Sequence, residues 1–367
     1  MNYKNCEVVL YFSGGINSYY QITQWAKPLY ELNKTNKVLF LITDSEVYNK
    51  VKKEHSFKAY HAQTFTNLIE FYEKNSFPVI LYINNSLRNF QSLRYQKAYH
   101  IHLNHGESEK ESMHSNQSKG YDYVFTVGQR GIDRYKENLL NFDEDKYISV
   151  GRPQLDFIEK IKLKKKKDQK VILYAPTWEA THNTMNYTSV KKYGLKLVKK
   201  LLNDDKYIVI YKPHSALGTR NPEIAKYNKD IKKLIKKNTN AYDMEDKDIN
   251  SIYTAIDFAF FDNSSVMIDY LHTLKPAAYL EIRKDVTINY LTKSFIKIDD
   301  ENFKKVEKTL KNELQKDSLK KIRKKIKKTY LGEFGKGQST KTFIDKINEI
   351  INHRNKEIKT KIYYKGK

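Results

Sequence analysis

The chain alternates short, strongly hydrophobic runs with longer segments in which apolar residues recur at helical spacing. This alternation predicts βαβ units, in which amphipathic helices connect the strands of a parallel sheet. The predicted strands of the first half are 7–12, 37–43, 77–83, 97–105, 121–128 and 146–151, and those of the second half are 170–177, 206–213, 241–244, 256–261 and 275–281. Predicted helices include 17–33, 63–75, 191–205 and 265–274, and after about residue 301 the pattern predicts charged helices only.

The two halves meet at Gly151-Arg152-Pro153, where the proline forces a turn. A lysine-rich stretch follows, which reads as either a helix or a linker. We therefore predict an α/β protein with two Rossmann-like domains, residues 1–150 and 151–305. A helical segment, 306–367, completes the chain, and its helices could cross back over the first domain.

Composition narrows the class of protein. The 367 residues suffice for two cores, and 40% hydrophobic content excludes a disordered chain. No apolar run approaches the roughly 18–20 residues that span a bilayer, and the N-terminus lacks the pattern of a signal peptide. The single cysteine, Cys6, permits no internal disulfide and no cysteine metal cluster. We expect a soluble or peripheral protein of the cytoplasm.

The formal net charge is +24, and much of it lies in two lysine blocks, 160–167 and 319–330. A basic surface attracts nucleic acid, anionic lipid headgroups or a phosphate-bearing polymer. Solvated helix faces account for the blocks equally well. The charge therefore predicts a polyanionic partner without choosing one.

Candidate chemistry lies at the ends of the predicted strands, because ligands of open α/β sheets bind beyond the carboxyl ends of the strands. After strand 97–105 come His105 and Gly106, with Lys110 nearby. An imidazole there could take a proton from a hydroxyl, and a capping or surface histidine is the simpler alternative. After strand 170–177, Thr177 and Trp178 suit a ligand pocket, although Trp178 could equally fill the core.

Two further strand ends carry polar groups. Lys212, His214 and Arg220 lie on one loop, and such cationic donors suit a phosphate or diphosphate, the alternative being a solvated loop. The step Asp262-Asn263-Ser264-Ser265 separates a strand from a helix. A helix cap needs only one of these four residues, so an anion site explains the step better. Together these strand ends predict a cleft enzyme that handles a phosphorylated donor.

The motifs HGxxxK, GxPxxD, LYAPTW, KPH and D(x)4DxSSxxxDY occur in this order over about residues 97–345. Their order and spacing resemble the motif series of the CDP-glycerol glycerophosphotransferases, the family of teichoic acid primases and polymerases and related capsule polymerases. The resemblance implies a GT-B arrangement, in which two Rossmann-like domains face a cleft and the donor nucleotide binds mainly to the second domain.

The resemblance also implies roles for individual residues. His105 matches the proposed general base and Lys110 its downstream lysine, while His214 matches a histidine that contacts the donor diphosphate. Ser264 and Ser265 match the paired serines that hold it. Further matches are the acidic frame Asp257, Asp262 and Asp269, the inter-domain residues Gly151, Pro153 and Asp156, and the closing glycine-rich motif at 334–347.

This chain departs from the family pattern at several positions. The family's HGxPLK is HGESEK here, Gln154 follows Pro153 where arginine is usual, Glu179 stands where a basic residue often follows Thr-Trp, and Asn263 replaces a tyrosine. The first 95 residues show no match. Their suggestive loop, 12–17, could approach an acceptor phosphate or form a plain βα turn with a helix cap at Asn17 or Ser18.

The resemblance implies an enzyme that moves a glycerol phosphate or related alditol phosphate from a CDP-activated donor to a polymer or lipid-linked acceptor, releasing CMP. A GT-B glycosyltransferase and a non-catalytic polyanion- or membrane-binding protein are the alternatives. We expect no cofactor and no nucleic-acid partner, a location on the inner face of the cell membrane, and work in teichoic acid or capsule polysaccharide biosynthesis. The lack of a DxD loop argues against an obligatory divalent cation without settling whether one assists, and the oligomeric state stays open.

Overall fold

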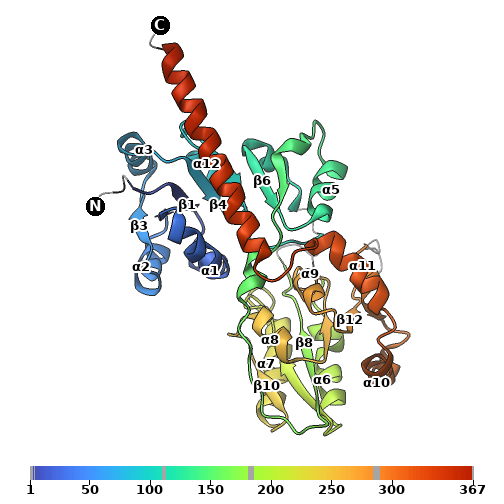
Figure 1. The fold of residues 1–367 in the computed structure, drawn as a ribbon. Helices are drawn as coiled ribbons and strands as arrows, with labels where there is room; N and C mark the ends of the chain where they lie inside the picture. Colours follow the sequence, from blue (N-terminus) through green and yellow to red (C-terminus); the bar gives the residue numbers. More distant parts are fainter. Residues whose placement is uncertain (1–2, 4, 110–112, 181–185, 284–289, 366–367) are drawn as a thin grey trace. The chain divides into compact units, whose positions relative to one another are not determined.

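The computed structural model describes residues 3, 5–109, 113–180, 186–283 and 290–365. Contacts within the chain divide it into two units (Figure 1). Unit 1 runs as far as Phe157 and takes up the chain again from Tyr330, and unit 2 comprises Ile158–Thr329. The hydrophobic pattern predicts boundaries at 150 and 305. The contacts divide the chain elsewhere because the last helix packs into unit 1.

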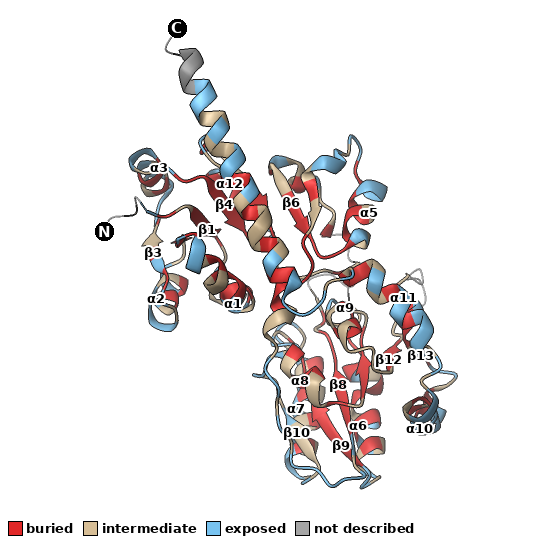
Figure 2. Ribbon diagram, in the orientation of Figure 1, coloured by how far each residue is buried: buried red, intermediate tan, exposed pale blue. Residues whose placement is uncertain are grey.

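Unit 1 contains a seven-stranded parallel sheet with the order β3-β2-β1-β4-β5-β6-β7. Its strands are β1 (Val8–Phe12), β2 (Val38–Ile42), β3 (Lys58–His61), β4 (Val79–Tyr82), β5 (Tyr99–His102), β6 (Tyr123–Thr126) and β7 (Tyr147–Ser149). In register, Val8 of β1 lies opposite Val38 and Val79. The central strands are hydrophobic throughout because helices cover both faces of a parallel sheet, and Figure 2 shows them buried.

The helices of unit 1 are α1 (Tyr20–Thr35), α2 (Ser45–Glu54), α3 (Phe65–Lys74), α4 (Asn89–Ser92), α5 (Gln129–Asn138) and α12 (Gln338–Lys365). Side-chain caps begin α2 and α3, where Asp44 accepts from the Val47 N–H and Thr64 from the Asn67 N–H. The cap expected at Asn17 or Ser18 is absent. A short 3-10 turn, Ile16–Ser18, leads into α1, which begins without a side-chain cap.

Unit 2 contains a six-stranded parallel sheet with the order β10-β9-β8-β11-β12-β13. Its strands are β8 (Lys170–Ala175), β9 (Tyr207–Tyr211), β10 (Ala241–Asp243), β11 (Phe258–Phe261), β12 (Ala277–Leu280) and β13 (Ile296–Ile298). Its helices are α6 (Leu195–Leu202), α7 (Pro222–Lys236), α8 (Ile249–Ala255), α9 (Val266–Tyr270), α10 (Val306–Lys316) and most of α11 (Lys320–Leu331). The lysine-rich stretch before β8 forms neither helix nor strand, so it is a linker.

The predicted α/β class is confirmed, with two parallel sheets and C-terminal helices. In both sheets the order of the parallel strands reverses beside the first strand, between β1 and β4 in unit 1 and between β8 and β11 in unit 2. We call this place the switch point of each sheet. Such a reversal opens a crevice beyond the carboxyl ends of the two central strands. Among the described residues, no helix combines the length and the hydropathy that a membrane span requires.

Helix α12 belongs to the core of unit 1. Its apolar side chains Phe343 and Ile347 are fully buried, and Phe343 lies against Trp25 with 5.5 Å between the ring centroids. The start of the helix contacts Asp156, whose carboxylate accepts hydrogen bonds from the N–H groups of Gly337 (2.8 Å) and Thr340 (2.7 Å). Two segments that are far apart in sequence are thereby joined at the start of α12.

The turn at Gly151 fits against the same helix start. Its φ is +78°, and an added Cβ would lie 2.2 Å from Ser339 Oγ and 2.8 Å from Phe334. Ser339 Oγ in turn accepts the Arg152 N–H at 3.2 Å. A side chain at position 151 would therefore both strain the backbone and displace the segment that leads into α12.

We expect Phe343→Ala to destabilise unit 1 by about 3–5 kcal/mol, because it opens a cavity in a core that cannot fully collapse. Hydrogen exchange should show reduced amide protection in β1 and β4 and unchanged protection in β8 and β9. Glu349→Ala, at an exposed position of the same helix, is the control. Unchanged protection in β1 and β4 would show that α12 is not part of this core.

Candidate functional site

The strand ends at the switch point of unit 2 are joined by Asp262, which directly follows β11. Asp262 is completely buried. Its Oδ2 accepts the N–H of Thr177 at 2.8 Å and that of Ser189 at 3.1 Å. Because Thr177 follows β8, one carboxylate holds the ends of both central strands.

The Asp262 carboxyl group can form more hydrogen bonds than the described residues supply. Burial raises its pKa to about 7, against the opposing effect of the hydrogen bonds from Ser189 and Thr177. Its Oδ1 and the hydroxyl of Ser264 are buried without a hydrogen-bond partner among the described residues. Buried polar atoms without partners are uncommon in native proteins, so these two atoms mark the switch point as a place for a ligand.

The serine pair is not used as a helix cap. Helix α9 begins at Val266 and has five residues, and its N-cap residue Ser265 makes no side-chain capping bond. The simpler explanation of the Asp-Asn-Ser-Ser step, a helix cap, therefore does not account for Ser265. A helix this short contributes little dipole, so an anion here would depend on hydroxyl and N–H groups.

His214 lies on the loop after β9 and is exposed. Its ring stacks on Trp178, with 5.8 Å between the centroids and 17° between the planes. Its Nδ1 accepts the Ala216 N–H at 3.1 Å, which places the proton of the neutral ring on Nε2. The Arg220 guanidinium lies 5.9 Å from the Trp178 ring. Trp178 also packs against the core of unit 2, as the simpler alternative for this residue predicts, and its place in a ligand pocket stays a prediction.

Glu179 departs from the family pattern, and the sequence predicts no role for it. In the structure its carboxylate accepts N–H bonds from Gly218, Arg220 and Asn221 of the His214 loop. The sequence holds no direct signal for this role, because the donors are backbone groups.

Two of the predicted site residues, Lys212 and Asp257, make hydrogen bonds with the backbone of unit 2. Lys212 Nζ donates to the Glu245 carbonyl at 2.5 Å, and burial lowers the Lys212 pKa. Asp257 precedes β11 and therefore lies at the edge of the sheet opposite to Asp262. It accepts the Val171 N–H at 2.8 Å. The structure thus does not bring Asp257 together with the residues at the carboxyl ends.

In unit 1, His105 follows β5. The Nδ1 atom of its ring is buried without a hydrogen-bond partner among the described residues. Its backbone carbonyl accepts a hydrogen bond from each of the two Nη atoms of Arg152, both at 3.3 Å. Burial and the Arg152 charge lower the His105 pKa to about 4, against a hydrogen bond to the Ile83 backbone. The imidazole is therefore neutral at pH 7, the form that a general base requires. Lys110 lies outside the described residues, and at Gly106 an added Cβ would meet Arg152 only at an ordinary 3.7 Å.

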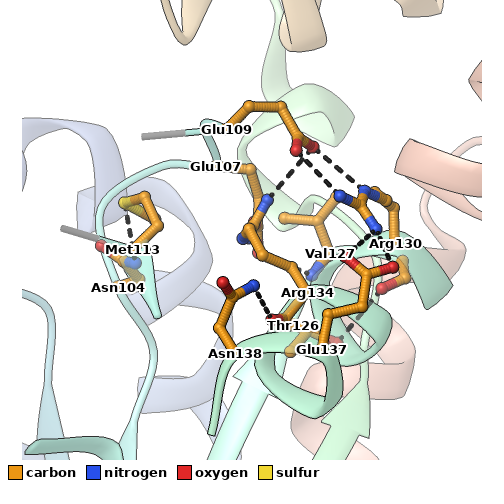
Figure 3. Close-up of polar contacts among 11 residues, drawn as sticks. Asn104, Glu107, Glu109, Met113, Thr126, Val127, Arg130, Arg134, Glu137 and Asn138 are labelled. Atoms are coloured by element: carbon orange, nitrogen blue, oxygen red, sulfur yellow. Dashed lines mark hydrogen bonds and ion pairs between the residues drawn. The ribbon is translucent and has the colours of Figure 1, made fainter. Parts of the chain in front are cut away.

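The acidic residues of HGESEK have partners on α5 (Figure 3). Glu107 pairs with Arg134, and Glu109 pairs with Arg130 at 3.0 Å and with Arg134 at 3.5 Å. Arg130 also reaches Glu137 at 2.7 Å. The acid gained in this loop is therefore matched by two arginines, and together they fasten the segment after His105 to α5.

Two cavities lie away from these residues. One, of about 640 Å³, runs between α7 and β10 and is lined by Lys229, Lys232, Lys233 and Lys236 together with apolar side chains. The other, of about 270 Å³, lies beyond β2 and β3 and includes Thr43, Gln63, Arg88 and Gln91. Within the described residues there is no group of three or more His, Cys, Asp or Glu side chains that could hold a metal ion.

These features define the class of protein. It is an α/β protein with two Rossmann-type sheets, in which polar groups gather at the carboxyl ends of the strands of each unit. The sequence profile of the CDP-Glycerol:Poly(glycerophosphate) glycerophosphotransferase family matches residues 26–347. The chain belongs to this family, and the resemblance inferred from its motifs is confirmed. The expectation that the first 95 residues show no match is wrong, because the family match begins at residue 26.

Curated relatives agree with this family. The chain is 24% identical over 168 residues to the teichoic acid glycerol-phosphate transferase of Staphylococcus aureus, covering 42% of this chain and 40% of the relative. It is 30% identical over 178 residues to the teichoic acid poly(glycerol phosphate) polymerase of Bacillus spizizenii, covering 44% and 41%. The chain thus spans about two fifths of the length of these relatives.

Solved structures share the fold. The wall teichoic acid polymerase TagF aligns with a TM-score of 0.64 at 16% identity, covering 95% of this chain and 90% of that one. The UDP-GlcNAc 2-epimerase of Neisseria meningitidis aligns with a TM-score of 0.60 at 14% identity, covering 94% and 100%. At such identities these likenesses concern the fold alone.

We expect Arg134→Met to destabilise unit 1 by about 3–5 kcal/mol, because it leaves the largely buried Glu107 carboxylate without its cation and removes one of the two arginines that pair with Glu109. Urea unfolding of the variant measures the loss. Lys136→Met, which removes an exposed ion pair from the same helix, should change stability much less. Equal losses in the two variants would contradict a special role for the network.

We expect the wild type to lose stability relative to Asp262→Asn as the pH rises from about 4 to 7. A folded-state pKa raised to about 7 means that the protonated carboxyl favours folding at low pH, and this contribution is lost as the pH rises through that value. Asparagine keeps an acceptor for the Thr177 and Ser189 N–H groups and does not titrate. The measurement is the difference in unfolding free energy between the two proteins as a function of pH, and a flat difference would contradict the raised pKa.

Proposed function

We propose that the protein transfers a glycerol phosphate or related alditol phosphate unit from a CDP-activated donor to a hydroxyl of an anionic polymer or lipid-linked acceptor, releasing CMP. The observation that carries this proposal is the family match over residues 26–347. The curated relatives are a glycerol-phosphate transferase and a poly(glycerol phosphate) polymerase of teichoic acid, and a TagF variant was solved with CDPG.

Unit 2 would bind the donor. Here Asp262 accepts the Thr177 N–H, and Asp262 Oδ1 and the Ser264 hydroxyl are buried without a partner in the part of the chain that the structure describes. His214 presents an Nε2–H, which suits a phosphate oxygen, and Arg220 supplies a second cationic donor on the same loop. Donor groups of this kind stabilise the charge that develops as CMP leaves.

Unit 1 would supply the base. The neutral His105 takes the proton of an acceptor hydroxyl as the oxygen attacks the β-phosphorus of the donor. A new phosphorus–oxygen bond forms, the bond between the β-phosphorus and the bridging oxygen breaks, and CMP leaves with that oxygen. A bound anionic acceptor would raise the low His105 pKa and so strengthen the base.

The proposed polymer and membrane partners are inferred from the net charge of the protein. With a net charge of +24, the protein suits an anionic polymer and the anionic inner face of a cell membrane, and we propose peripheral attachment there from the cytoplasm. Four lysines along the cavity beside α7 would favour the same kind of polymer. No cofactor is needed for the proposed transfer, and nucleic acid is not among the proposed partners.

Replacing the two histidines tests the reaction. We expect His105→Ala to lower CMP release by about 10²–10⁴-fold, the usual contribution of a positioned acid or base, and His214→Ala to lower it comparably. Circular dichroism should show that both variants stay folded. His353→Ala, at an exposed histidine, is the control. Near-wild-type turnover in either site variant would overturn its assigned role.

The donor separates this proposal from a sugar transferase. Similarity to an epimerase bound to UDP-GlcNAc, although limited to the fold, makes that second candidate concrete. We expect nucleotide release from CDP-glycerol or CDP-ribitol and none from UDP- or CMP-sugars. The reverse result would make the protein a glycosyltransferase, and salt-sensitive binding of polyanions without turnover of any donor would make it a binding protein.

A further inference from the structure

The carboxylate of Glu179 holds the second half of the His214 loop. Glu179 is 6% exposed, and its Oε2 accepts the Gly218 N–H at 2.8 Å. Its Oε1 accepts the N–H groups of Arg220 at 2.8 Å and Asn221 at 3.0 Å. Both oxygens of one buried side chain are therefore committed to the backbone of this loop.

These bonds depend on the negative charge. Burial alone would raise the Glu179 pKa, but the N–H groups of Gly218, Arg220 and Asn221 more than offset burial, so that the pKa lies below its usual value. The side chain is thus ionised at neutral pH. Because the loop N–H groups surround the charge, it is largely compensated locally and would repel a nearby phosphate less than a bare carboxylate.

The neighbouring residues connect this clamp to the first half of the loop. The carbonyl of Pro176 accepts the His214 N–H at 3.1 Å, and the ring of Trp178 contacts both the His214 ring and the Arg220 guanidinium. The segment from Pro176 to Glu179 therefore touches the loop at its beginning, along its side chains and at its end.

The loop has little freedom to compensate if the clamp is lost. Gly218 has a φ of +85°, and an added Cβ would lie 2.7 Å from Ala225 Cα, so the chain passes close to α7 here. Asn221 then caps α7 by accepting the Glu223 N–H at 2.9 Å. Between these two fixed points, Arg220 is held by the bond from its own N–H to Glu179 and by its contact with Trp178.

We propose that Glu179 is a positioning residue of the donor site. By gathering the loop N–H groups it holds His214 with its Nε2–H and Arg220 with its guanidinium in the arrangement that receives a diphosphate, without touching the donor itself. The donor half of this inference rests on the function proposed above.

Glu179→Gln is the sharpest variant, because it keeps the shape and removes the charge. Its amide has one acceptor oxygen, so its NH₂ group would face either the Gly218 N–H or the N–H groups of Arg220 and Asn221. Glu179→Asp keeps the charge on a shorter side chain and serves as the second variant if the first does not fold. Glu223→Gln is the matched control, because Glu223 is an exposed carboxylate that pairs with Lys191.

Two measurements decide the matter. Nitrogen-15 spectra of the histidine rings should show the Nε2–H tautomer of His214 in the wild type and in Glu223→Gln, and a mixture of tautomers in Glu179→Gln. Calorimetry with CDP-glycerol should show at least a 10-fold weaker Kd for Glu179→Gln and no change for Glu223→Gln. Glu179→Asp should fall between the wild type and Glu179→Gln in both measurements.

The outcomes separate this inference from the proposed function. If the wild type binds CDP-glycerol and the folded Glu179 variants bind it equally well, the positioning role is overturned. If the wild type does not bind CDP-glycerol, the proposed donor is wrong, and the ring spectra alone decide whether Glu179 sets the state of His214. An unchanged His214 tautomer in the Glu179 variants overturns the inference in either case.

Discussion

The candidate site depends on buried carboxylates that accept backbone N–H groups. At the carboxyl edge of a parallel sheet the chain leaves the ladder, and its N–H groups lose their partners while still shielded from water. Asp262 gathers such groups at the switch point, and Glu179 gathers them in the His214 loop. The partly buried Asp156 accepts the N–H groups of Gly337 and Thr340 at the start of α12 in the same way. A carboxylate offers two oxygens in place of a single carbonyl, so one side chain can join segments that are distant in sequence.

This arrangement links the acidity of these groups to the shape of the loops. The same N–H donors that hold Glu179 ionised also hold the loop, so its charge and its loop geometry form one property. Asp262 differs because burial prevails and raises its pKa, and because one of its oxygens has no hydrogen-bond partner among the residues that the structure describes. A ligand that donates a hydrogen bond at the switch point would complete the hydrogen bonding of Asp262.

Much of the fold could be predicted because central strands of a parallel sheet are hydrophobic on both faces and stand out as continuous runs. Strands β3 and β13 could not be predicted, because they lack such continuous hydrophobic runs. Each lies at a sheet edge and pairs with one neighbour, and the short sequences KAYH and IKI carry too few buried residues to be recognised. The pattern predicts charged C-terminal helices that could cross back over the first domain, and α12 does pack into unit 1. Local pattern does not identify which helix returns, because the residues that α12 contacts are separated from it in sequence by all of unit 2.

Some residues of the candidate site could be predicted from the sequence and others could not. Polar side chains at the ends of predicted strands, such as Thr177, His214 and Asp262, could be found because strand direction places them at one edge. Glu179 and Ser189 could not. Glu179 accepts backbone N–H groups, and Ser189 donates its own backbone N–H to Asp262, so both contacts depend on the course of loops that the sequence does not reveal. Asp257 shows the converse limit, because a conspicuous carboxylate one strand length from Asp262 lies at the other end of that strand.

The packing of α12 has a consequence for how the protein is made. Ribosomes deliver the chain from its N-terminus, so the seven strands of unit 1 emerge before the helix that closes their core. All of unit 2 must be synthesised in the interval. During that time the apolar surface that later receives Phe343 and Ile347 is uncovered, and the nascent chain is most exposed to chaperones and to aggregation. Unit 2 is contiguous in sequence, so it can complete its fold before the helix that unit 1 needs has been synthesised.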